Sequence, residues 1–507
     1  MSSKIAQKFL RTIPVHMTLL LMTMMLSSCM QPGGTGSQDT TSAQPVISIM
    51  APLHFPKPPT SELIQEIEKL TGTKLDINLI PDGIYTDKMN TALTTNSLKK
   101  VTFVKHTDYI LMKNAIRTDA FWEIGPYLQE FKNLSQLNPS ILEQSSVDGR
   151  IYGLYTERPS SRQGAIIRED WLNKLGLEPP STLDELYEVL YRFTYEDPDG
   201  NGIQDTIGIA DRNDLVFGAF KTLGSYMGTP NNWLLEEGKF IPEFETEAYF
   251  QTMDYMKKLY EEKLINLDFA VTSKELQRNM VIRGTAGVYI GSLTDVQRLS
   301  DETKAINPDA SFTMVNRIAG PMGPRVWSIP NYNGLYLFSK KAIKTEEELK
   351  QVLAFFDRTM DEDVANLMKY GIEGRHYTMV NGLVYLPEET SQLRVNEVNA
   401  FYTLMIADMS NPNILKIAGK EALTSEAERL IEDNDNFLVA DPTIHLESKT
   451  YDEISNNLNR IITDATYNYI LGNLTEDGFK QEVKKWRNSG GDQIIKEYEE
   501  AYAKQNN

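Results

Sequence analysis

The chain has 507 residues and a formal net charge of −19 at pH 7, with 51 Lys and Arg against 70 Asp and Glu. This acidic balance disfavours nucleic acid and anionic lipid as partners. The single cysteine excludes an internal disulfide, and the length is too great for one hydrophobic core, so we expect two or more lobes.

The N-terminus has the features of a secretory signal. Three basic residues precede an apolar run, which ends in LSSC at positions 26–29. The run is too short and too abruptly ended for a stable membrane span. LSSC resembles the lipobox of bacterial lipoproteins, which predicts that residues 1–28 are a signal peptide and that Cys29 becomes the mature N-terminus, lipidated with fatty acids such as palmitate. The alternative is an ordinary signal peptide with a chance cysteine near its cleavage site.

The segment after this cysteine lacks the residues that build a core. Residues 29–45 are mostly Gly, Ser, Thr and Gln with almost no charge, so we expect a flexible tether. The ordered part is expected to begin near Val46. No later stretch approaches about 18 consecutive apolar residues, so the predicted membrane anchor is lipid only.

The first ordered elements read as strand, helix, strand. VISIM at 46–50 is a short apolar run, and KLDINLI at 74–80 alternates apolar and polar residues. Between them, the helical pattern at 60–72 places four apolar residues on one face and ends at Gly72. This order predicts an α/β lobe that opens with a parallel pair of strands.

Further elements follow in the same alternation. Helices are predicted over 84–96, 246–263 and 345–358, and after Thr182, which forms a capping box with Glu185. Strands are predicted over 101–106, 149–157, 163–168, 287–293 and 333–340. From about residue 450 the chain is predicted to be helical. The sequence therefore indicates a helix-rich α/β protein.

Several motifs occur in a characteristic order: DGRIYGL at 148–154, IIREDWLNKLGL at 166–177 and PPSTLDEL at 179–186. Together with the lipobox, the sequence resembles the extracellular solute-binding proteins of family 1, the lipoprotein receptors of carbohydrate ABC transporters. The pattern is most similar to the oligosaccharide-receptor and alginate-receptor branch. The Gly-Asp-rich stretch that this family usually carries is replaced by TTNSLKKVTFVKHTD at 94–108, which leaves the identity of the ligand open.

The resemblance implies a two-lobed α/β fold like that of periplasmic binding proteins, with a type II-like hinge. Lobe 1 would comprise residues 46–165 plus about 331–400, and lobe 2 residues 166–330. The mainly helical part at 401–507 would pack across both lobes.

The resemblance also implies a function. The protein would capture an oligosaccharide or sugar acid and deliver it to the permease subunits of an ABC transporter. It would be anchored by lipid on the extracellular face of the cell membrane, and we expect a monomer. The acidic net charge mildly favours neutral sugars, although local charge decides this.

The stretch EDPDGNGIQDT at 196–206 spaces oxygen-bearing side chains as calcium loops do. The expected Ca²⁺ ligands are Asp197, Asp199, Asn201, the carbonyl of Ile203, and Asp205. The usual bidentate Glu of such a loop is missing, so this is an incomplete EF-hand pattern. The alternative is a metal-free turn, since Asp, Asn and Gly are common turn formers. A structural rather than ligand-binding calcium is expected.

Sugar receptors stack aromatic side chains on ring faces and direct polar side chains at hydroxyl groups. In α/β proteins such residues lie on loops that follow strands. The candidates on such loops are Tyr155, Arg158, Trp233, Trp327 and Tyr332. Each could equally be structural.

No catalytic signature accompanies these candidates. The five histidines form no metal-binding motif, and no Gly-x-Ser-x-Gly sequence is present. We therefore expect no enzymatic activity and no catalytic residue. Two alternatives stay open: a lipid-anchored polysaccharide hydrolase or lyase with a structural calcium, which needs only two carboxylates, and a surface glycan adhesin.

Overall fold

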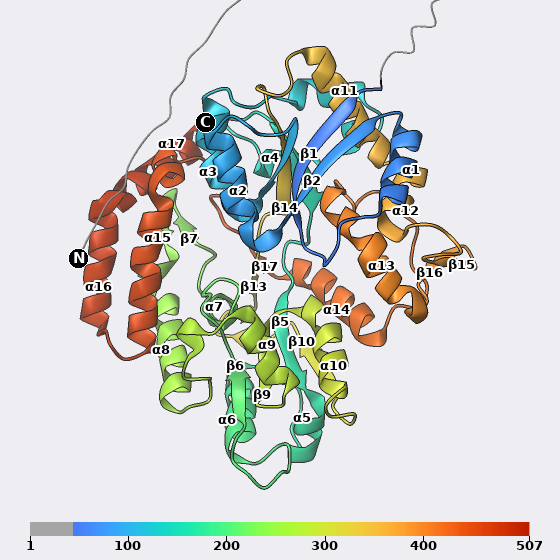
Figure 1. Ribbon diagram of the computed structural model, residues 1–507. Coiled ribbons are helices and arrows are strands. Elements are labelled where there is room, and N and C mark those ends of the chain that lie inside the picture. Colours follow the sequence, from blue (N-terminus) through green and yellow to red (C-terminus); the bar gives the residue numbers. More distant parts are fainter. Residues whose placement is uncertain (1–43, 506–507) are drawn as a thin grey trace, which may run out of the picture. The chain divides into compact units, whose positions relative to one another are not determined.

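The computed structural model describes residues 44–505, which belong to one compact unit (Figure 1). Cys29, the predicted signal peptide and nearly all of the predicted tether lie outside the described residues. Two separate sheets organise the unit, each with its own hydrophobic core, so the expected two-lobed α/β fold is confirmed.

The sheet of lobe 1 has the strand order β2-β1-β3-β14-β4. Its strands are β1 (Val46–Leu53), β2 (Lys74–Pro81), β3 (Val101–Lys105), β4 (Gly153–Glu157) and β14 (Tyr332–Phe338). β1 pairs in parallel with β2 and β3, as the opening strand-helix-strand pattern predicts. β14 is antiparallel to β3 and to β4. Residues 46–157 and the distant strand β14 therefore contribute to the same hydrophobic core.

The sheet of lobe 2 has the order β10-β5-β9-β6. Its strands are β5 (Gln163–Arg168), β6 (Ile207–Ala210), β9 (Ala286–Ser292) and β10 (Phe312–Val315). Four two-stranded pairs complete the strands: β7 (Trp233–Glu236) with β8 (Lys239–Pro242), β11 (Ala319–Gly320) with β12 (Gly323–Pro324), β13 (Val326–Trp327) with β17 (Leu438–Val439), and β15 (Thr378–Val380) with β16 (Leu383–Tyr385).

Helices surround both sheets (Figure 1). In the first half of the chain they are α1 (Ser61–Thr71), α2 (Asp82–Thr94), α3 (His106–Arg117), α4 (Pro139–Gln144), α5 (Glu169–Leu175), α6 (Leu183–Tyr195), α7 (Ala219–Met227) and α8 (Glu247–Glu261). In the second half they are α9 (Lys274–Ile282), α10 (Val296–Lys304), α11 (Glu346–Thr359), α12 (Glu362–Tyr370), α13 (Ser391–Glu397), α14 (Ala422–Asp433), α15 (Lys449–Ile470), α16 (Glu476–Trp486) and α17 (Asp492–Gln505).

Local sequence determines where several of these helices begin and end. α1 ends at Gly72, whose φ of 68° is a left-handed conformation that glycine adopts without strain. α6 begins after Thr182, whose side chain accepts a hydrogen bond from the backbone N–H of Glu185. The same arrangement starts α11 at Thr345 and Glu348. These caps confirm the predicted helix starts.

Three segments connect the lobes. Residues 158–162 lead from β4 to β5, residues 316–331 lead from β10 to β14, and the chain returns to lobe 2 after residue 407. The first two segments lie side by side, because the backbone N–H of Arg158 donates to the carbonyl of Asn331 at 3.0 Å. Such paired crossings are the structural basis of a hinge.

The C-terminal helices join the core of lobe 2 through Leu458, Trp486 and Tyr498. They also reach lobe 1, because Asp452 of α15 forms an ion pair with Arg117 of α3. Within residues 44–505, no helix is both long and apolar enough to cross a membrane.

Candidate functional site

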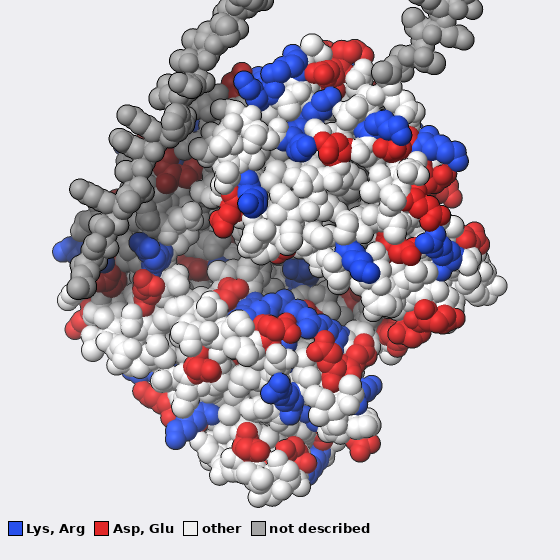
Figure 2. Space-filling model, viewed as in Figure 1, with Lys and Arg blue, Asp and Glu red and all other residues white. Residues whose placement is uncertain are grey.

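A cleft lies where the carboxyl ends of the lobe 1 strands face lobe 2. Three cavities form it, and all three are lined by His106 and Thr107, which directly follow β3. Asp214, from the loop after β6 of lobe 2, lines two of them. Figure 2 shows a hollow that crosses this face, with Lys and Arg gathered along its lower edge. The edge where strand carboxyl ends meet is the usual ligand site of α/β proteins.

The first cavity, here the arginine cavity, encloses about 490 Å³ and is strongly cationic. Its lining includes five basic residues and two acidic ones: Lys105, Arg158, Arg162, Arg212, Lys274, Asp82 and Asp214. This local excess of positive charge stands in a chain of net charge −19. The volume falls within the range of about 300–1,000 Å³ typical of small-molecule sites.

Three of these basic residues have carboxylate partners: Lys105 with Asp82, Arg212 with Asp214, and Lys274 with Asp295. Arg158 and Arg162, both on the first crossing segment, differ. Among the described residues, no carboxylate forms an ion pair with either guanidinium. Arg158 Nη2 and Arg162 Nε are buried without a hydrogen-bond partner, although Arg158 Nε donates to the carbonyl of Pro330 at 2.9 Å.

The electrostatics of Arg158 reflect this lack of compensation. Burial and the neighbouring charge of Arg162 lower the pKa of Arg158 to about 10. Arg158 therefore stays charged at neutral pH, at a cost in free energy that a bound anion would offset.

Two uncharged side chains add unsatisfied polar atoms to the same cavity. His106 Nδ1 and Gln163 Oε1 are buried and have no hydrogen-bond partner. Burial, with a smaller contribution from Arg158, lowers the pKa of His106 to about 3, so His106 is neutral at ordinary pH. Buried polar atoms are rarely left unpaired unless a ligand or water meets them. The cavity thus presents both donors and acceptors.

The second cavity, here the aromatic cavity, encloses about 340 Å³ and adjoins the first at Phe217 and Asp214. Phe217 packs against Trp327 with ring centroids 5.6 Å apart. The third cavity, of about 310 Å³, is lined by Tyr109, Tyr332 and the segment before α15. The three cavities together form a continuous groove that touches both lobes.

The structure distributes the five predicted sugar-binding residues unevenly. Arg158, Trp327, Tyr332 and Trp233 each line one of the cleft cavities. Tyr155 does not reach the cleft, which corrects the expectation. Its side chain is fully buried in the core of lobe 1, and its hydroxyl accepts a hydrogen bond from the backbone of Asn138.

The other aromatic candidates are also largely structural. Trp327 is 2 % exposed, and its indole N–H donates to Thr222 at 3.0 Å. Trp233 is 6 % exposed and packs edge to face on Tyr498. Tyr332 packs edge to face on His106. These rings form the walls of the groove and hold its more accessible residues in place.

The predicted calcium loop lies between α6 and β6, and its side chains form hydrogen bonds within the loop. Asp197 accepts hydrogen bonds from the backbone N–H groups of Gly200 and Gly202, and the amide of Asn201 donates to Asp199 and Asp205. Burial and the neighbouring carboxylates raise the pKa of Asp199. In the described part of the chain, no group of three or more His, Cys, Asp and Glu side chains is arranged to hold a metal ion. Calcium binding therefore stays a prediction.

The end of this loop holds the predicted ligands Ile203 and Asp205, followed by Thr206 and Gly208, which are not predicted ligands. Ile203 is 61 % exposed. Thr206 is buried, and its hydroxyl donates to the carbonyl of Phe193, so it does not face the loop. Gly208, at the position of the missing bidentate Glu, already belongs to β6.

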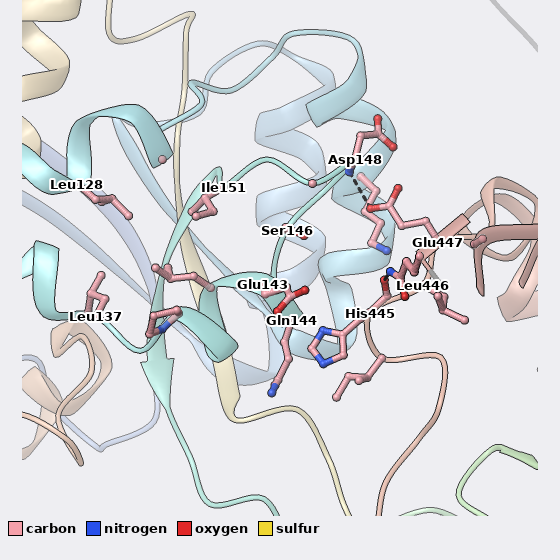
Figure 3. A pocket seen from close by; sticks show the side chains of 18 of the residues that line it. Leu128, Leu137, Glu143, Gln144, Ser146, Asp148, Ile151, His445, Leu446 and Glu447 are labelled. Carbon is pink, nitrogen blue, oxygen red and sulfur yellow. Dashed lines mark hydrogen bonds between the residues drawn. The ribbon is translucent and has the colours of Figure 1, made fainter. Parts of the chain in front are cut away.

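A cavity of about 610 Å³ lies outside this groove (Figure 3). Figure 3 shows Leu128, Leu137 and Ile151 on one side and the segment His445–Glu447 on the other. The backbone N–H of Asp148 donates to Glu447 across its rim at 2.8 Å. Its lining mixes apolar with polar side chains, and Lys113, Asp148 and Glu447 form ion pairs. The cleft, where Arg158 and Arg162 have buried nitrogens without a partner, is the better candidate site.

Several cleft residues carry no sequence motif that marks them: Lys105, His106, Arg162, Arg212, Phe217 and Lys274. The sequence singles out only Lys105 and His106. They belong to the stretch at 94–108, where the sequence departs from the pattern of the resembling family.

Comparisons with known proteins identify the family and the fold of this chain. A family model described as bacterial extracellular solute-binding protein matches residues 57–356. The polygalacturonan/rhamnogalacturonan-binding protein YtcQ of Bacillus subtilis (strain 168) is 45% identical over 459 residues, 90% of this chain and 91% of YtcQ. Lipoprotein LipO of the same organism is 33% identical over 498 residues, 96% of this chain and 97% of LipO.

A solved structure shows the same fold. The HMO binding ABC-transporter associated solute binding protein from Bifidobacterium longum infantis ATCC 15697 superimposes with a TM-score of 0.72 at 17% identity. The match covers 91% of this chain and 99% of that chain.

Proposed function

Because the chain belongs to the bacterial extracellular solute-binding protein family, we propose that it is the receptor of a carbohydrate ABC transporter and captures an acidic oligosaccharide in the cleft between its lobes. The inference that the ligand is acidic rests on the guanidinium groups of Arg158 and Arg162, whose charges no carboxylate compensates. The 45% identical relative is named for binding polygalacturonan and rhamnogalacturonan, which supports a ligand that contains uronic acid.

The arginine cavity suits a sugar carboxylate for a geometric reason. A guanidinium presents N–H donors in a planar fork that matches the two oxygens of a carboxylate. Arg158 and Arg162 have such donors free inside a largely desolvated cavity. A bound carboxylate would compensate both charges at once. Gln163 Oε1 then offers an acceptor to a sugar hydroxyl group, and His106 Nδ1 offers a donor or an acceptor according to the tautomer of the ring.

Ligand binding across the groove would favour closure of the hinge. His106 and Lys105 come from lobe 1, whereas Arg212 and Phe217 come from lobe 2. A sugar that contacts both sides binds the closed form more tightly, and this difference in affinity shifts the population toward closure. The closed form is then the one that an ABC transporter permease distinguishes from the free receptor.

Two further features belong to this proposal. Lipidation at Cys29 would hold the receptor at the extracellular face of the membrane, and a relative named as a lipoprotein supports it. A structural Ca²⁺ would be held by side-chain oxygens of Asp197, Asp199, Asn201 and Asp205, which lie close together within the loop, and by the carbonyl of Ile203. The donor set is entirely oxygen, as a hard cation requires. When bound, Ca²⁺ would neutralise carboxylates that otherwise repel one another.

The decisive experiment compares acidic and neutral oligosaccharides of equal length on the purified mature chain. Galacturonate oligomers should bind in calorimetry and compact the protein in small-angle scattering, whereas neutral galactose oligomers should bind far more weakly. Equal binding of both series would contradict the acidic assignment.

Product analysis separates the receptor from its alternatives. The ligand should be recovered intact after long incubation, because the proposal contains no chemical step. Release of shortened or unsaturated sugars in amounts well above one per protein would instead support the hydrolase or lyase. Failure to co-purify with, or to stimulate transport by, an ABC permease would favour a surface adhesin.

A further inference from the structure

The aromatic cavity differs in chemistry from the arginine cavity beside it. The surface it exposes is mostly apolar, and six of its fourteen lining residues are apolar: Val216, Phe217, Trp327, Ile329, Pro330 and Ile444. Because the two cavities share Phe217, Asp214, His106 and Thr107, neighbouring rings of one oligosaccharide would occupy both.

The charges at the rim of the aromatic cavity are negative or already paired. Its only lysine, Lys221, is committed to Glu243 and Asn232. Two carboxylates, Asp214 and Asp441, also line it. Asp441 accepts hydrogen bonds from Asn232 and Thr443 but forms no ion pair with any described residue. His106 is neutral here as well.

A second sugar carboxylate would be disfavoured in this cavity. It would face Asp441, which has no ion-pair partner among the described residues, and the described lining of the cavity holds no cation free to compensate it. Asp214, by contrast, is paired with Arg212. Desolvating an unpaired carboxylate carries a further cost. An uncharged ring with an apolar C6 substituent incurs neither cost, because it carries no charge. Its apolar face can in addition contact Phe217.

The position of Phe217 is fixed by its surroundings. Its backbone N–H donates to the Asp214 carboxylate at 2.9 Å, and its carbonyl accepts from Arg212. Its ring packs on Trp327, which is itself held through its N–H by Thr222. The ring is only partly buried and borders both cavities. A rigid aromatic face of this kind is suited to a methyl or methyl-ester group.

On this basis we propose that the cleft selects a mixed oligosaccharide, with a free carboxylate on the ring in the arginine cavity and an uncharged, apolar-faced ring beside it in the aromatic cavity. This inference rests on the proposed function and specifies its ligand. A 6-deoxyhexose or a methyl-esterified uronic acid has the required chemistry. A chain in which every ring is charged should still bind through the arginine cavity, but more weakly, because its second carboxylate faces Asp441.

The test uses four forms of one disaccharide, digalacturonic acid: the free diacid, its two monomethyl esters and its dimethyl ester. One monoester should bind about tenfold more tightly than the diacid, and the diester should bind most weakly. A disaccharide of galacturonic acid and a 6-deoxyhexose should also bind more tightly than the diacid. Tightest binding by the diacid would overturn the inference while leaving the proposed function intact.

Two variants sharpen this test. Asp441→Asn removes the unpaired rim charge but keeps an acceptor for Asn232, so the preference for the monoester over the diacid should shrink several-fold. Phe217→Leu keeps the side chain apolar without the aromatic face, and it should reduce the affinity for the 6-deoxyhexose disaccharide. Unchanged ratios in both variants, with the fold retained by circular dichroism, would contradict the assignment. Binding by none of these sugars would contradict the proposed function itself.

Discussion

Arg117 of α3 and Asp452 of α15 form an ion pair of 2.8 Å that links a helix of lobe 1 to the C-terminal helices on lobe 2. Lys113 approaches the other carboxylate oxygen at 3.3 Å. The Asp452 side chain is only 2% exposed. The charges of Arg117 and Lys113 are therefore both compensated by a buried carboxylate. The ion pair therefore helps to hold the two lobes together, and Asp452 also lines the third cavity of the cleft.

Removing this carboxylate should destabilise the protein. Asp452→Asn leaves Arg117 and Lys113 without their buried partner, and the free energy of unfolding should fall by up to about 3 kcal/mol. Urea denaturation measures the change. Asp464→Asn, at an exposed position of the same helix, is the matched control and should have little effect. Equal stability of both variants would show that the buried pair contributes nothing.

Arg162 should matter for binding and not for stability. Arg162→Gln removes one guanidinium from the arginine cavity, so the affinity for a galacturonate oligomer should fall about tenfold or more. The melting temperature should stay the same or rise, because the repulsion with Arg158 is relieved. The dependence of affinity on salt should also become weaker. Arg283→Gln, on the exposed surface of lobe 2, should change neither quantity.

Glu497 should give the stability a measurable pH dependence. Burial alone would raise its pKa, but hydrogen bonds from Ser448, Gln493 and Thr450 outweigh burial and lower the pKa from its ordinary value of 4.5 to about 2. Because the folded pKa is depressed, the stabilisation is complete above about pH 4.5 and is lost as the pH falls toward 2.

The matching variant is Glu497→Gln. Its unfolding free energy should lie below that of the wild type at pH 7, and the two curves should converge as the pH falls through this window. Chemical denaturation at pH values from 7 to 2.5 checks this. A gap that stays constant with pH would mean that the ionised carboxylate is not the stabilising group.

Calcium should stabilise the loop at 197–205 without affecting the cleft. Adding Ca²⁺ after EDTA should raise the melting temperature by a few degrees, and Mg²⁺ should do less because it demands a tighter octahedron. Asp199→Ala should abolish this response and keep its affinity for sugar, whereas Asp309→Ala, at another exposed carboxylate of lobe 2, should keep the response. If the wild type does not respond to Ca²⁺, the loop is a metal-free turn.

Cys29 should determine where the protein is found. Cys29→Ala should move the protein from the membrane fraction to the medium, or leave an uncleaved precursor, because the lipid acceptor is gone. Fractionation and intact mass measure this. The same mass and the same membrane location in the variant would exclude lipidation at this residue. Cys29→Ser serves as a second variant, since it changes only the thiol.

Sequence patterns alone predicted the local elements well. The alternation in KLDINLI, the capping box at Thr182 and the stop at Gly72 predict elements that the structure contains at nearly the same positions. Each depends on interactions between residues close in the chain, which periodicity and capping chemistry describe directly. The order of motifs likewise sufficed to indicate the two-lobed receptor fold.

The ligand site depended on contacts that the sequence does not contain. Arg158 and Arg162 are unusual only because the fold brings no carboxylate to them, although the chain has 70 acidic residues. The net charge of −19 mildly favoured a neutral sugar, whereas the arginine cavity is positive. Tyr155 was expected on a loop after a strand, but it lies within β4 and its side chain points into the core. Local sequence sets each strand and helix, but only the tertiary structure decides which charges are compensated and which side chains face the cleft, because both depend on neighbours up to hundreds of residues away.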